Sequence, residues 1–329
     1  MTDASDGLTM VDAINRALHE AMAEDDSTAV MGQDVGVNGG VFRVTEGLID
    51  DYGAARVIDT PLAESGIVGL AIGMAMNGAR PIAEMQFSGF SYYALAQIEN
   101  HAARIRWRTR GAHTVPLVIR MPYGAGVRAL EHHSESREVF YGHMPGLKTV
   151  IPATPARAHA LLHVAIRDPD PVIFMEPKAV YRQMREPIAD DAEPAQIGTS
   201  RVVRRGKDLT LVSYGAMLHR ALEAAETLAA EDIDIEVIDI ETIAPLDVET
   251  IAKSVGQTGR LLIVNEAPPS YGAAGEIAMR VIEQEFYALR VPIRRVCGWD
   301  VHVPFFAREQ TYLPSVDRIR GAARGMMTD

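Results

Sequence analysis

Apolar positions recur along the chain at two alternating spacings, one typical of helices and one of short strands. Residues 9–23 carry apolar side chains at helical spacing, and Thr9 with Asp12 forms a capping-box pattern at the start of this segment. Thr154 followed by Pro155 marks the start of another helix. The further predicted helices cover residues 65–77, 92–108, 155–167, 216–230, 247–255 and 275–287. The predicted strands cover residues 29–31, 56–58, 81–87, 115–121, 147–151, 171–175, 209–214, 235–240, 261–265 and 293–296.

This alternation of strands and helices is typical of βαβ units and predicts mainly parallel sheets in both halves of the chain. The pattern breaks between residues 181 and 206, where Pro187 and Pro194 flank an acidic run, which indicates an interdomain linker. We therefore predict an α/β domain over residues 1–185, a linker over 186–206 and a second α/β domain over 207–329. The acidic run consists of Asp190, Asp191 and Glu193.

The charge balance narrows the class of protein. The chain has 329 residues, with 32 Lys and Arg against 44 Asp and Glu, so the net charge is −12. Nucleic-acid binding is disfavoured because phosphate contacts need a basic surface. Hydrophobic residues make up 47% and charged residues 23%, which excludes a disordered chain or a coiled coil. The longest apolar run, residues 66–76, is too short to span a bilayer, so we expect no membrane segment.

The single cysteine and the opening residues bear on location. Cys297 cannot form an internal disulfide or a multi-cysteine metal site, and it is expected to be a small buried apolar residue. Residues 1–7 are polar and acidic and lack the basic region of a secretory signal peptide. Both features fit a reducing compartment and predict a cytoplasmic protein.

The first candidate segment for chemistry lies where a predicted strand ends and a glycine-rich helix begins. Ligands of open α/β sheets sit beyond the carboxyl ends of strands, and Glu64 lies at such a junction. Glu64 is either a helix N-terminal carboxylate stabilised by the helix dipole or a group that shares a proton with a ligand nitrogen. Gly66, Gly69 and Gly73 do not form a dinucleotide-binding G-x-G-x-x-G pattern. Their spacing instead lets the helix lie close to a sheet or to another helix.

Two further segments carry aromatic and titratable side chains. Residues 84–93 place aromatic residues after a strand, for core packing or for stacking against a flat heterocycle. Residues 123–135 include His132 and His133, whose adjacency lacks the i, i+4 spacing of helical zinc sites and disfavours a transition-metal site. This segment is either a solvated loop or the place of general acid–base catalysis by one histidine.

The last candidate segment, residues 165–171, contains Asp168, Pro169 and Asp170 between a predicted helix and a predicted strand. It is either a simple turn or a cage of carbonyl groups for a hard cation. The chain contains neither a P-loop nor a G-x-S-x-G motif, so the sequence predicts neither a P-loop nucleotide site nor a hydrolase nucleophile.

Taken together, these segments resemble the beta subunit of the decarboxylating first component of 2-oxo acid dehydrogenase complexes. That family includes pyruvate, branched-chain 2-oxo acid and acetoin dehydrogenases. The resemblance implies an α/β transketolase-type pyrimidine-binding domain, with helices on both faces of a parallel sheet, and a smaller α/β transketolase C-terminal-like domain. The stretches that carry it, in the family's order, are MGQDVGVNGGVF, VIDTPLAESGIVG, GARPIAEMQFSGF, HHSES, PGLKTVIPATP, IRDPDPVIFMEPK and TYLP.

The resemblance also implies a chemistry. The family oxidatively decarboxylates a 2-oxo acid with thiamine diphosphate and transfers the acyl group to lipoyl. It maps the glutamate that hydrogen-bonds the aminopyrimidine ring onto Glu64 and the aromatic residue beside that ring onto Phe90. It maps the histidine that assists proton transfer during acyl transfer onto His133. Family precedent for potassium, held mainly by backbone carbonyls, maps onto Leu117, Ala165, Ile166, Asp168 and Asp170.

One missing motif points to a partner. Thiamine enzymes hold the diphosphate and Mg²⁺ with a G-D-G motif, and this chain contains none. The resemblance therefore implies an alpha subunit that completes the site in an α2β2 heterotetramer, and a lipoyl acyltransferase core that docks on the assembly. Many relatives have an acidic residue where this chain has Gln33, so the role of that side chain stays open.

Two alternatives come from other classes of protein. An NAD-dependent oxidoreductase would require the absent G-x-G-x-x-G pattern. A non-catalytic α/β interaction module would leave the positions of Glu64 and His133 to arbitrary residues. An acetoin dehydrogenase beta subunit is the alternative within the family.

Overall fold

The computed structural model describes residues 7–189 and 194–328. The polar opening at 1–6 and the acidic run at 190–193 lie outside the described residues. The chain folds as two units: residues up to 123 together with 140–197, and residues 124–139 together with the chain from 198 onward. Among the described residues, no helix combines the length and the apolar character that a membrane crossing needs.

The first unit is built on a parallel sheet with the strand order β5-β6-β4-β3-β1-β2. Every residue of β1, β4 and β6 is buried, as expected for a sheet covered on both faces. The strands are β1 (Thr28–Gly32), β2 (Val57–Asp59), β3 (Arg80–Glu84), β4 (Val118–Tyr123), β5 (Lys148–Val150) and β6 (Val172–Pro177).

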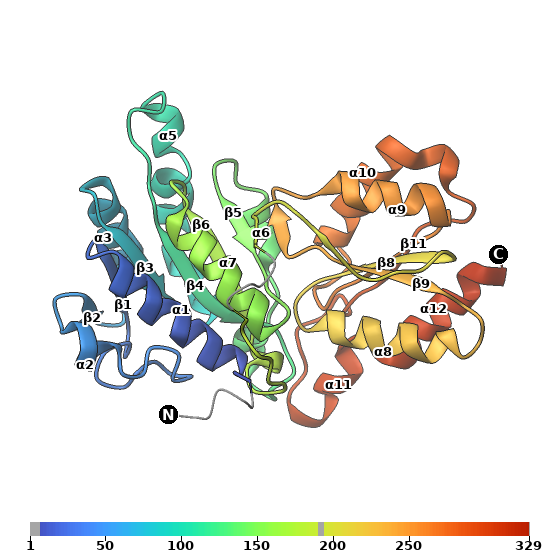
Figure 1. The fold of residues 1–329 in the computed structure, drawn as a ribbon, viewed down its shortest axis with the longest axis horizontal. Helices are drawn as coiled ribbons and strands as arrows, with labels where there is room; N and C mark the ends of the chain where they lie inside the picture. Colours follow the sequence, from blue (N-terminus) through green and yellow to red (C-terminus); the bar gives the residue numbers. More distant parts are fainter. Residues whose placement is uncertain (1–6, 190–193, 329) are drawn as a thin grey trace. The chain divides into compact units, whose positions relative to one another are not determined.

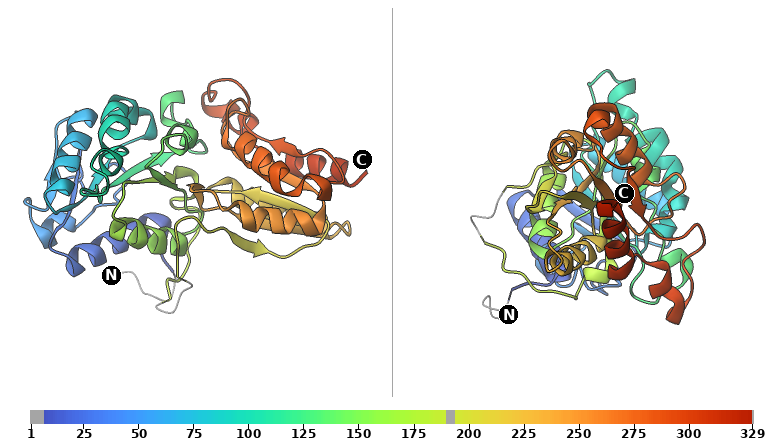
Figure 2. Two further views of the ribbon diagram at one scale, coloured as in Figure 1. Left: turned by 90° about the horizontal axis from the view of Figure 1, so that it is seen from above. Right: turned by 90° about the vertical axis from the view of Figure 1, so that its right-hand side faces the viewer.

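Helices α1 (Met10–Glu24) and α7 (Pro155–Arg167) pack side by side on one face of this sheet (Figure 1). The capping box of Thr9 and Asp12 and the Thr154 cap before Pro155 are both present, so these two predictions are confirmed. Helix α3 (Glu64–Met76) lies on the opposite face (Figure 2). Shorter helical elements are α2 (Leu48–Tyr52), α6 (Glu138–Gly142) and the 3₁₀ turn η5 (Lys178–Val180). The 3₁₀ turn η4 (Glu131–His133) belongs to the second unit.

The single helix predicted over residues 92–108 is wrong. The structure divides this stretch into a 3₁₀ segment, a short α-turn, a π-helical turn and a second α-turn. The Ser91 hydroxyl donates to the Ser88 carbonyl at 2.5 Å, and such local hydrogen bonds favour tight turns over a continuing helix. The four segments are η2 (Ser88–Ala94), α4 (Leu95–Gln97), η3 (Ile98–Ala102) and α5 (Ile105–Arg108).

The second unit contains a five-stranded sheet with the order β12-β11-β8-β9-β7. Its edge strand β7 (Arg201–Arg204) runs antiparallel to β9 and lies inside the predicted linker. Two consecutive valines between arginines are too short an apolar run to stand out in the hydrophobic pattern. The other strands of this sheet are β8 (Leu209–Ser213), β9 (Ile235–Asp239), β11 (Leu261–Val264) and β12 (Arg294–Val296). The short strand β10 (Thr242–Ala244) lies in the same part of the chain but is not a member of this sheet.

Helices cover both faces of this second sheet, with α8 and α12 on one side and α9 and α10 on the other (Figure 1). Cys297 follows β12 and is buried, as predicted. Burial raises the pKa of its thiol to about 11, against the opposing effect of Arg295 and Arg318, so the thiol stays protonated at neutral pH. The helices are α8 (Met217–Ala229), α9 (Val248–Thr258), α10 (Ala273–Glu285), α11 (Glu309–Tyr312) and α12 (Val316–Thr328), with the 3₁₀ turns η6 (Phe286–Ala288) and η7 (Phe306–Arg308).

Candidate functional site

Glu64 opens helix α3, a few residues beyond the carboxyl end of β2. Its side chain is partly buried. Among the described residues, none forms a hydrogen bond or an ion pair with its carboxylate. A helix N-terminus stabilises a negative charge, so the position of Glu64 agrees with the interpretation that it is a carboxylate stabilised by the helix dipole. The two carboxylate oxygens are therefore available to a ligand.

Helix α3 is apolar around its whole circumference, yet one side of it is uncovered. Leu70 is 53% and Met76 is 43% exposed. A Cβ added at Gly73 would meet nothing within 4 Å, and one at Gly66 would meet only Ala63. A helix without a polar face is normally buried. The exposed side of α3 therefore has the character of a contact surface.

The loop after β1 is tied to the end of β2 by a carboxylate. Asp59 accepts hydrogen bonds from the backbone N–H groups of Gly36 at 2.6 Å and Val37 at 3.1 Å. A Cβ at Gly36 would come within 2.7 Å of the Asp59 carboxylate, so glycine is needed for this approach. No sequence pattern singles out Asp59, because its partners lie 22 and 23 residues away.

Phe90 lies in η2, after the end of β3, and η2 packs against α3. The ring of Phe90 meets that of Phe87 edge to face, with centroids 5.9 Å apart. Phe87 in turn contacts the ring of Phe42 at 5.5 Å. The structure thus brings the elements that carry Glu64 and Phe90 together, and both interpretations of Phe90, packing and stacking, are compatible with this partly buried ring.

Three buried charges lie on the central strands, with Arg120 between two glutamates. Arg120 of β4 donates to Glu84 of β3 at 2.7 Å and contacts Glu176 of β6 at 2.7 and 3.0 Å. The Tyr181 hydroxyl also donates to Glu176, at 2.5 Å. Burial raises the pKa of Glu84 although Arg120 opposes this effect. Burial also acts to lower the pKa of Arg120, but the two carboxylates outweigh it and hold that pKa above its usual value. This network ties β4 to the ends of β3 and β6.

His133 belongs to the second unit of the chain. It ends the turn η4, where its backbone N–H donates to Leu130 at 3.0 Å, and its ring lies 4.1 Å from that of His132. Ser134 reinforces the same turn by donating from its hydroxyl to the Leu130 carbonyl at 3.0 Å. His133 is therefore held in a defined turn rather than in an open loop.

Two carboxylates from distant parts of the sequence hold the segment 124–139. Glu266 accepts from the backbone N–H of Ala125 at 2.8 Å, and Glu309 accepts from that of Arg128 at 3.0 and 3.1 Å. Gly124 has a φ of +83°, and a Cβ there would approach Glu266 to 2.7 Å. Sequence reasoning missed both glutamates because they are 141 and 181 residues from their partners.

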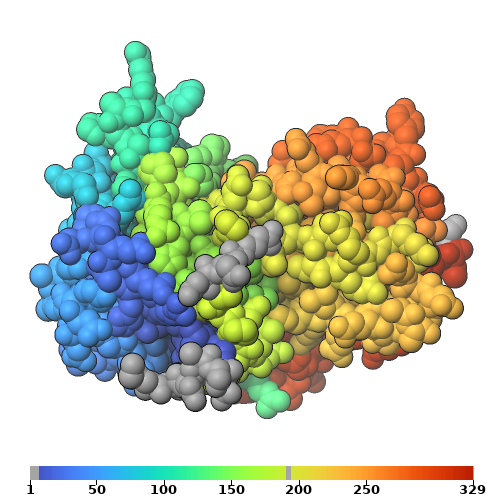
Figure 3. Space-filling view, viewed as in Figure 1, coloured from blue at the N-terminus to red at the C-terminus, as the bar shows by residue number. Residues whose placement is uncertain are grey.

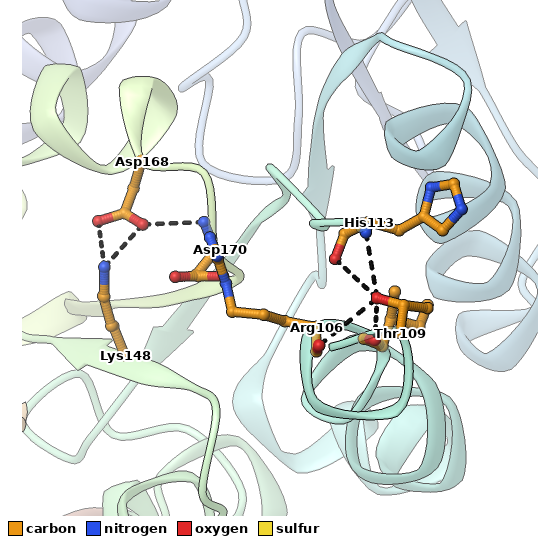
Figure 4. Close-up of polar contacts among 7 residues, drawn as sticks. Arg106, Thr109, His113, Lys148, Asp168 and Asp170 are labelled. Carbon is orange, nitrogen blue, oxygen red and sulfur yellow. Dashed lines mark hydrogen bonds and ion pairs between the residues drawn. The ribbon is translucent and has the colours of Figure 1, made fainter. Parts of the chain in front are cut away.

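The five residues predicted to bind potassium lie at the end of α7 and the start of β4. The Leu117 carbonyl accepts from Val172 and the Ala165 carbonyl from Asp168, while the Ile166 carbonyl accepts from Arg80 at 2.9 Å. Lys148 donates to both oxygens of Asp168, at 2.6 and 2.7 Å (Figure 4), and Arg106 donates to Asp170 at 2.5 Å. Side-chain cations of the protein thus already neutralise both carboxylates, and the donor set fits a simple turn at least as well as a potassium cage.

A histidine pair that the sequence reasoning missed lies elsewhere in the first unit. His159 and His163 are four residues apart on α7, and both contact Glu20 of α1. The signal is present in the sequence, since H-x-x-x-H on a predicted helix places both rings on one face. Their carboxylate partner, by contrast, is more than a hundred residues away and becomes apparent only in the fold.

Comparison with known families divides the chain into two domains, and residues 124–139, which fold with the second unit, fall within the first match. The transketolase pyrimidine-binding domain matches residues 6–184, and the transketolase C-terminal domain matches residues 198–319. In fold, the chain is similar to the solved structure of a split-gene transketolase, an inactive beta4 tetramer. The TM-score is 0.81 at 23% identity, over 98% of this chain and 99% of that one. The two predicted α/β transketolase-type domains are confirmed.

Relatives of similar length carry the comparison further. The chain is 47% identical to the beta subunit of the pyruvate dehydrogenase E1 component of Acholeplasma laidlawii, over 96% of this chain and 97% of that subunit. It is also 47% identical to the 3-methyl-2-oxobutanoate dehydrogenase subunit beta of Mycobacterium tuberculosis, over 97% of this chain and 92% of that subunit. The pyruvate dehydrogenase E1 beta subunit of Bacillus subtilis is 42% identical over 97% of this chain and 98% of its own length. The chain therefore belongs to the family of E1 beta subunits of pyruvate and branched-chain 2-oxo acid dehydrogenases, which act in the oxidative decarboxylation of 2-oxo acids.

Proposed function

We propose that this chain supplies the pyrimidine side of a thiamine diphosphate site and completes it together with an alpha subunit. The observation that carries the proposal is the Glu64 carboxylate, which is partly buried, lies beyond a parallel strand and has no partner among the described residues. A carboxyl group in that position can share a proton with the ring nitrogen of an aminopyrimidine. Phe90, on the element packed against α3, would provide an apolar wall for the same ring.

Thiamine diphosphate, when bound, would provide an electron sink for the negative charge left on the substrate as carbon dioxide departs. The part of this chain is to position and exchange protons. Glu64 would hold a proton against a pyrimidine nitrogen, which favours the reactive tautomer of the ring. His133 would move a proton during transfer of the acyl group to lipoyl, and its fixed turn keeps the ring in a defined position.

The diphosphate half of the site would come from the alpha subunit. The chain lacks the G-D-G motif that would anchor diphosphate and Mg²⁺. The uncovered apolar side of α3, next to Glu64, offers a surface for the subunit that brings this missing half. We propose an α2β2 assembly that docks on a lipoyl acyltransferase core in the cytoplasm.

Two substrates are favoured equally by the relatives, since a pyruvate and a 3-methyl-2-oxobutanoate dehydrogenase subunit are both 47% identical. An acetoin dehydrogenase subunit is a third candidate within the family. The test is to co-express the chain with a candidate alpha subunit from the same source. Reduction of an artificial electron acceptor is then measured with pyruvate, 3-methyl-2-oxobutanoate and acetoin. Turnover of one substrate would assign it. Absence of turnover with all three, in an assembled and cofactor-loaded complex, would favour the non-catalytic interaction module.

Potassium binding at the turn 165–170 stays a prediction. Melting temperatures of the assembled complex in potassium chloride and in choline chloride at equal ionic strength test it. Equal values would leave Lys148 and Arg106 as the cations that stabilise the turn.

A further inference from the structure

Helices α1 and α7 bring three metal-ligating side chains to one point. His159 and His163 lie one helical turn apart on α7, so their rings project from the same face. Glu20 projects from the facing helix α1, and its Oε2 lies 2.7 Å from His159 Nε2 and 2.8 Å from His163 Nε2. The ligand atoms of the three residues all lie within 4.8 Å of one another.

The dimensions of this cluster suit a small divalent ion. Zinc bonds to nitrogen and oxygen of about 2.0–2.2 Å place neighbouring ligands of a tetrahedral site about 3.4 Å apart. The two Nε2–Oε2 distances, 2.7 and 2.8 Å, need to open by only a fraction of an ångström to reach that value.

The surroundings orient the ligands and leave room for access. Arg16 donates from Nε to Glu20 Oε1 at 2.6 Å, so one carboxylate oxygen is held by a neighbour and the other faces the histidines. Such outer hydrogen bonds fix the direction of a ligand. The histidine side chains are 14% and 10% exposed and that of Glu20 is 35% exposed, so the point is sheltered but reachable from solvent. Residues of α1 and α7 lie next to each other on the molecular surface shown in Figure 3.

We propose that Glu20, His159 and His163 form a zinc-binding site that joins α1 to α7. Two neutral imidazoles and one carboxylate are a donor set that zinc favours, and a fourth position is left for water. The site lies on the face of the first sheet opposite α3 (Figure 2). The site therefore lies apart from Glu64, and it is independent of the proposed function.

The test is a zinc titration of the full-length chain after treatment with a chelator, followed by competition with a chromophoric zinc indicator. We expect one equivalent of Zn²⁺ to bind and to raise the melting temperature. Cobalt(II) substituted at the same site should give the intense visible absorption of a tetrahedral complex. Because loss of an outer-shell partner alone weakens metal sites by about 10–100-fold, loss of a ligand should weaken zinc by at least that factor.

The variants are His163→Ala, His159→Ala and the nearly isosteric Glu20→Gln, which is the most conservative of the three if the alanine variants fail to fold. His113→Ala, which removes an exposed histidine outside the cluster, is the matched control and should bind zinc like the wild type. Zinc affinity that is the same in Glu20→Gln, His163→Ala and the wild type would overturn the proposal. So would the absence of stoichiometric binding to the wild-type chain, which would leave the cluster as a carboxylate hydrogen-bonded to two imidazoles.

Discussion

At the scale of single residues, the Glu64 carboxylate is the group on which the proposed chemistry depends most. Glu64→Gln keeps the size of the side chain but removes its ability to hold a proton between itself and a ring nitrogen. We expect decarboxylation by the assembled complex to fall by about 10²–10⁴-fold, the usual range for loss of a general acid–base group. Glu46→Gln, at an exposed glutamate of the same unit, is the control and should keep full activity. Unchanged decarboxylation in Glu64→Gln would remove this residue from cofactor activation.

His133 permits a sharper test because its proposed role belongs to one half-reaction. We expect His133→Ala to slow acyl transfer to lipoyl by about 10²-fold or more while decarboxylation measured with an artificial oxidant is much less affected. His132→Ala changes the neighbouring ring, 4.1 Å away, and should leave the ratio of the two rates as in the wild type. Losses of equal size in both assays would assign His133 to a step that the two assays share.

The sequence singles out candidate residues only where the pattern of their immediate neighbours in the chain is distinctive. Glu64 stands out because a strand end, a carboxylate and a glycine-rich helix follow one another within a few positions. Asp59, Glu266 and Glu309 could not be identified in this way. Each accepts hydrogen bonds from backbone N–H groups distant in sequence, and no periodicity records such a contact. The pair His159 and His163 is a different case, since its spacing is visible in the sequence and only its partner Glu20 required the fold.

At the scale of the secondary-structure elements, strand β4 contributes a charge that the core depends on. Arg120→Leu would leave Glu84 and Glu176 buried without their cation. We expect a loss of about 3–5 kcal/mol in the free energy of unfolding, because breaking a buried ion pair leaves an uncompensated charge. Urea denaturation followed by circular dichroism measures this loss. Arg167→Leu, at an exposed pair with Glu24, should change stability by no more than about 0.5 kcal/mol. A similar small change in Arg120→Leu would mean that the two carboxylates are protonated in the native chain.

Helix α3 allows stability and assembly to be separated. Gly73→Leu places a side chain where the structure has open space, and leucine favours a helix over glycine by about 0.8–1 kcal/mol. The chain should therefore melt at the same or a higher temperature. It should no longer co-elute with the alpha subunit in size-exclusion chromatography, because the added side chain occupies the proposed contact surface. Gly321→Leu, at an open helical glycine of α12, should leave co-elution intact. Normal assembly of Gly73→Leu would place the alpha subunit elsewhere.

Elements were predictable where local signals agreed with one another. The caps of α1 and α7 and the buried runs of the parallel strands were visible in the sequence, since capping and burial on both faces leave local patterns. The helix predicted over residues 92–108 failed because helix-forming composition was outweighed by local hydrogen bonds and a π-helical turn. Strand β7 was not predicted because an antiparallel edge strand of four residues depends on its partner β9 more than on its own pattern.

At the scale of the whole molecule, the chain combines two complete α/β units with one half of the proposed cofactor site. Each sheet is covered by helices on both faces, so neither unit lacks a core. In the proposed site, Glu64 would share a proton with the pyrimidine ring, whereas the sequence contains no G-D-G motif to anchor diphosphate and Mg²⁺. The exposed apolar side of α3, which begins at Glu64, is the surface on which we expect the alpha subunit with the diphosphate site to bind.

This division of the site makes a prediction about binding that no single substitution tests. In calorimetric titration with thiamine diphosphate and Mg²⁺, the isolated chain should give little or no binding heat, because a pyrimidine contact alone leaves the charged diphosphate in water. The chain co-purified with its alpha subunit should bind tightly, and thiamine without the diphosphate should bind weakly to the same complex. Tight binding of thiamine diphosphate to the isolated chain would mean that this chain holds its own diphosphate site. The alpha subunit would then be needed for something other than the cofactor, and the two-subunit account of the active site would be wrong.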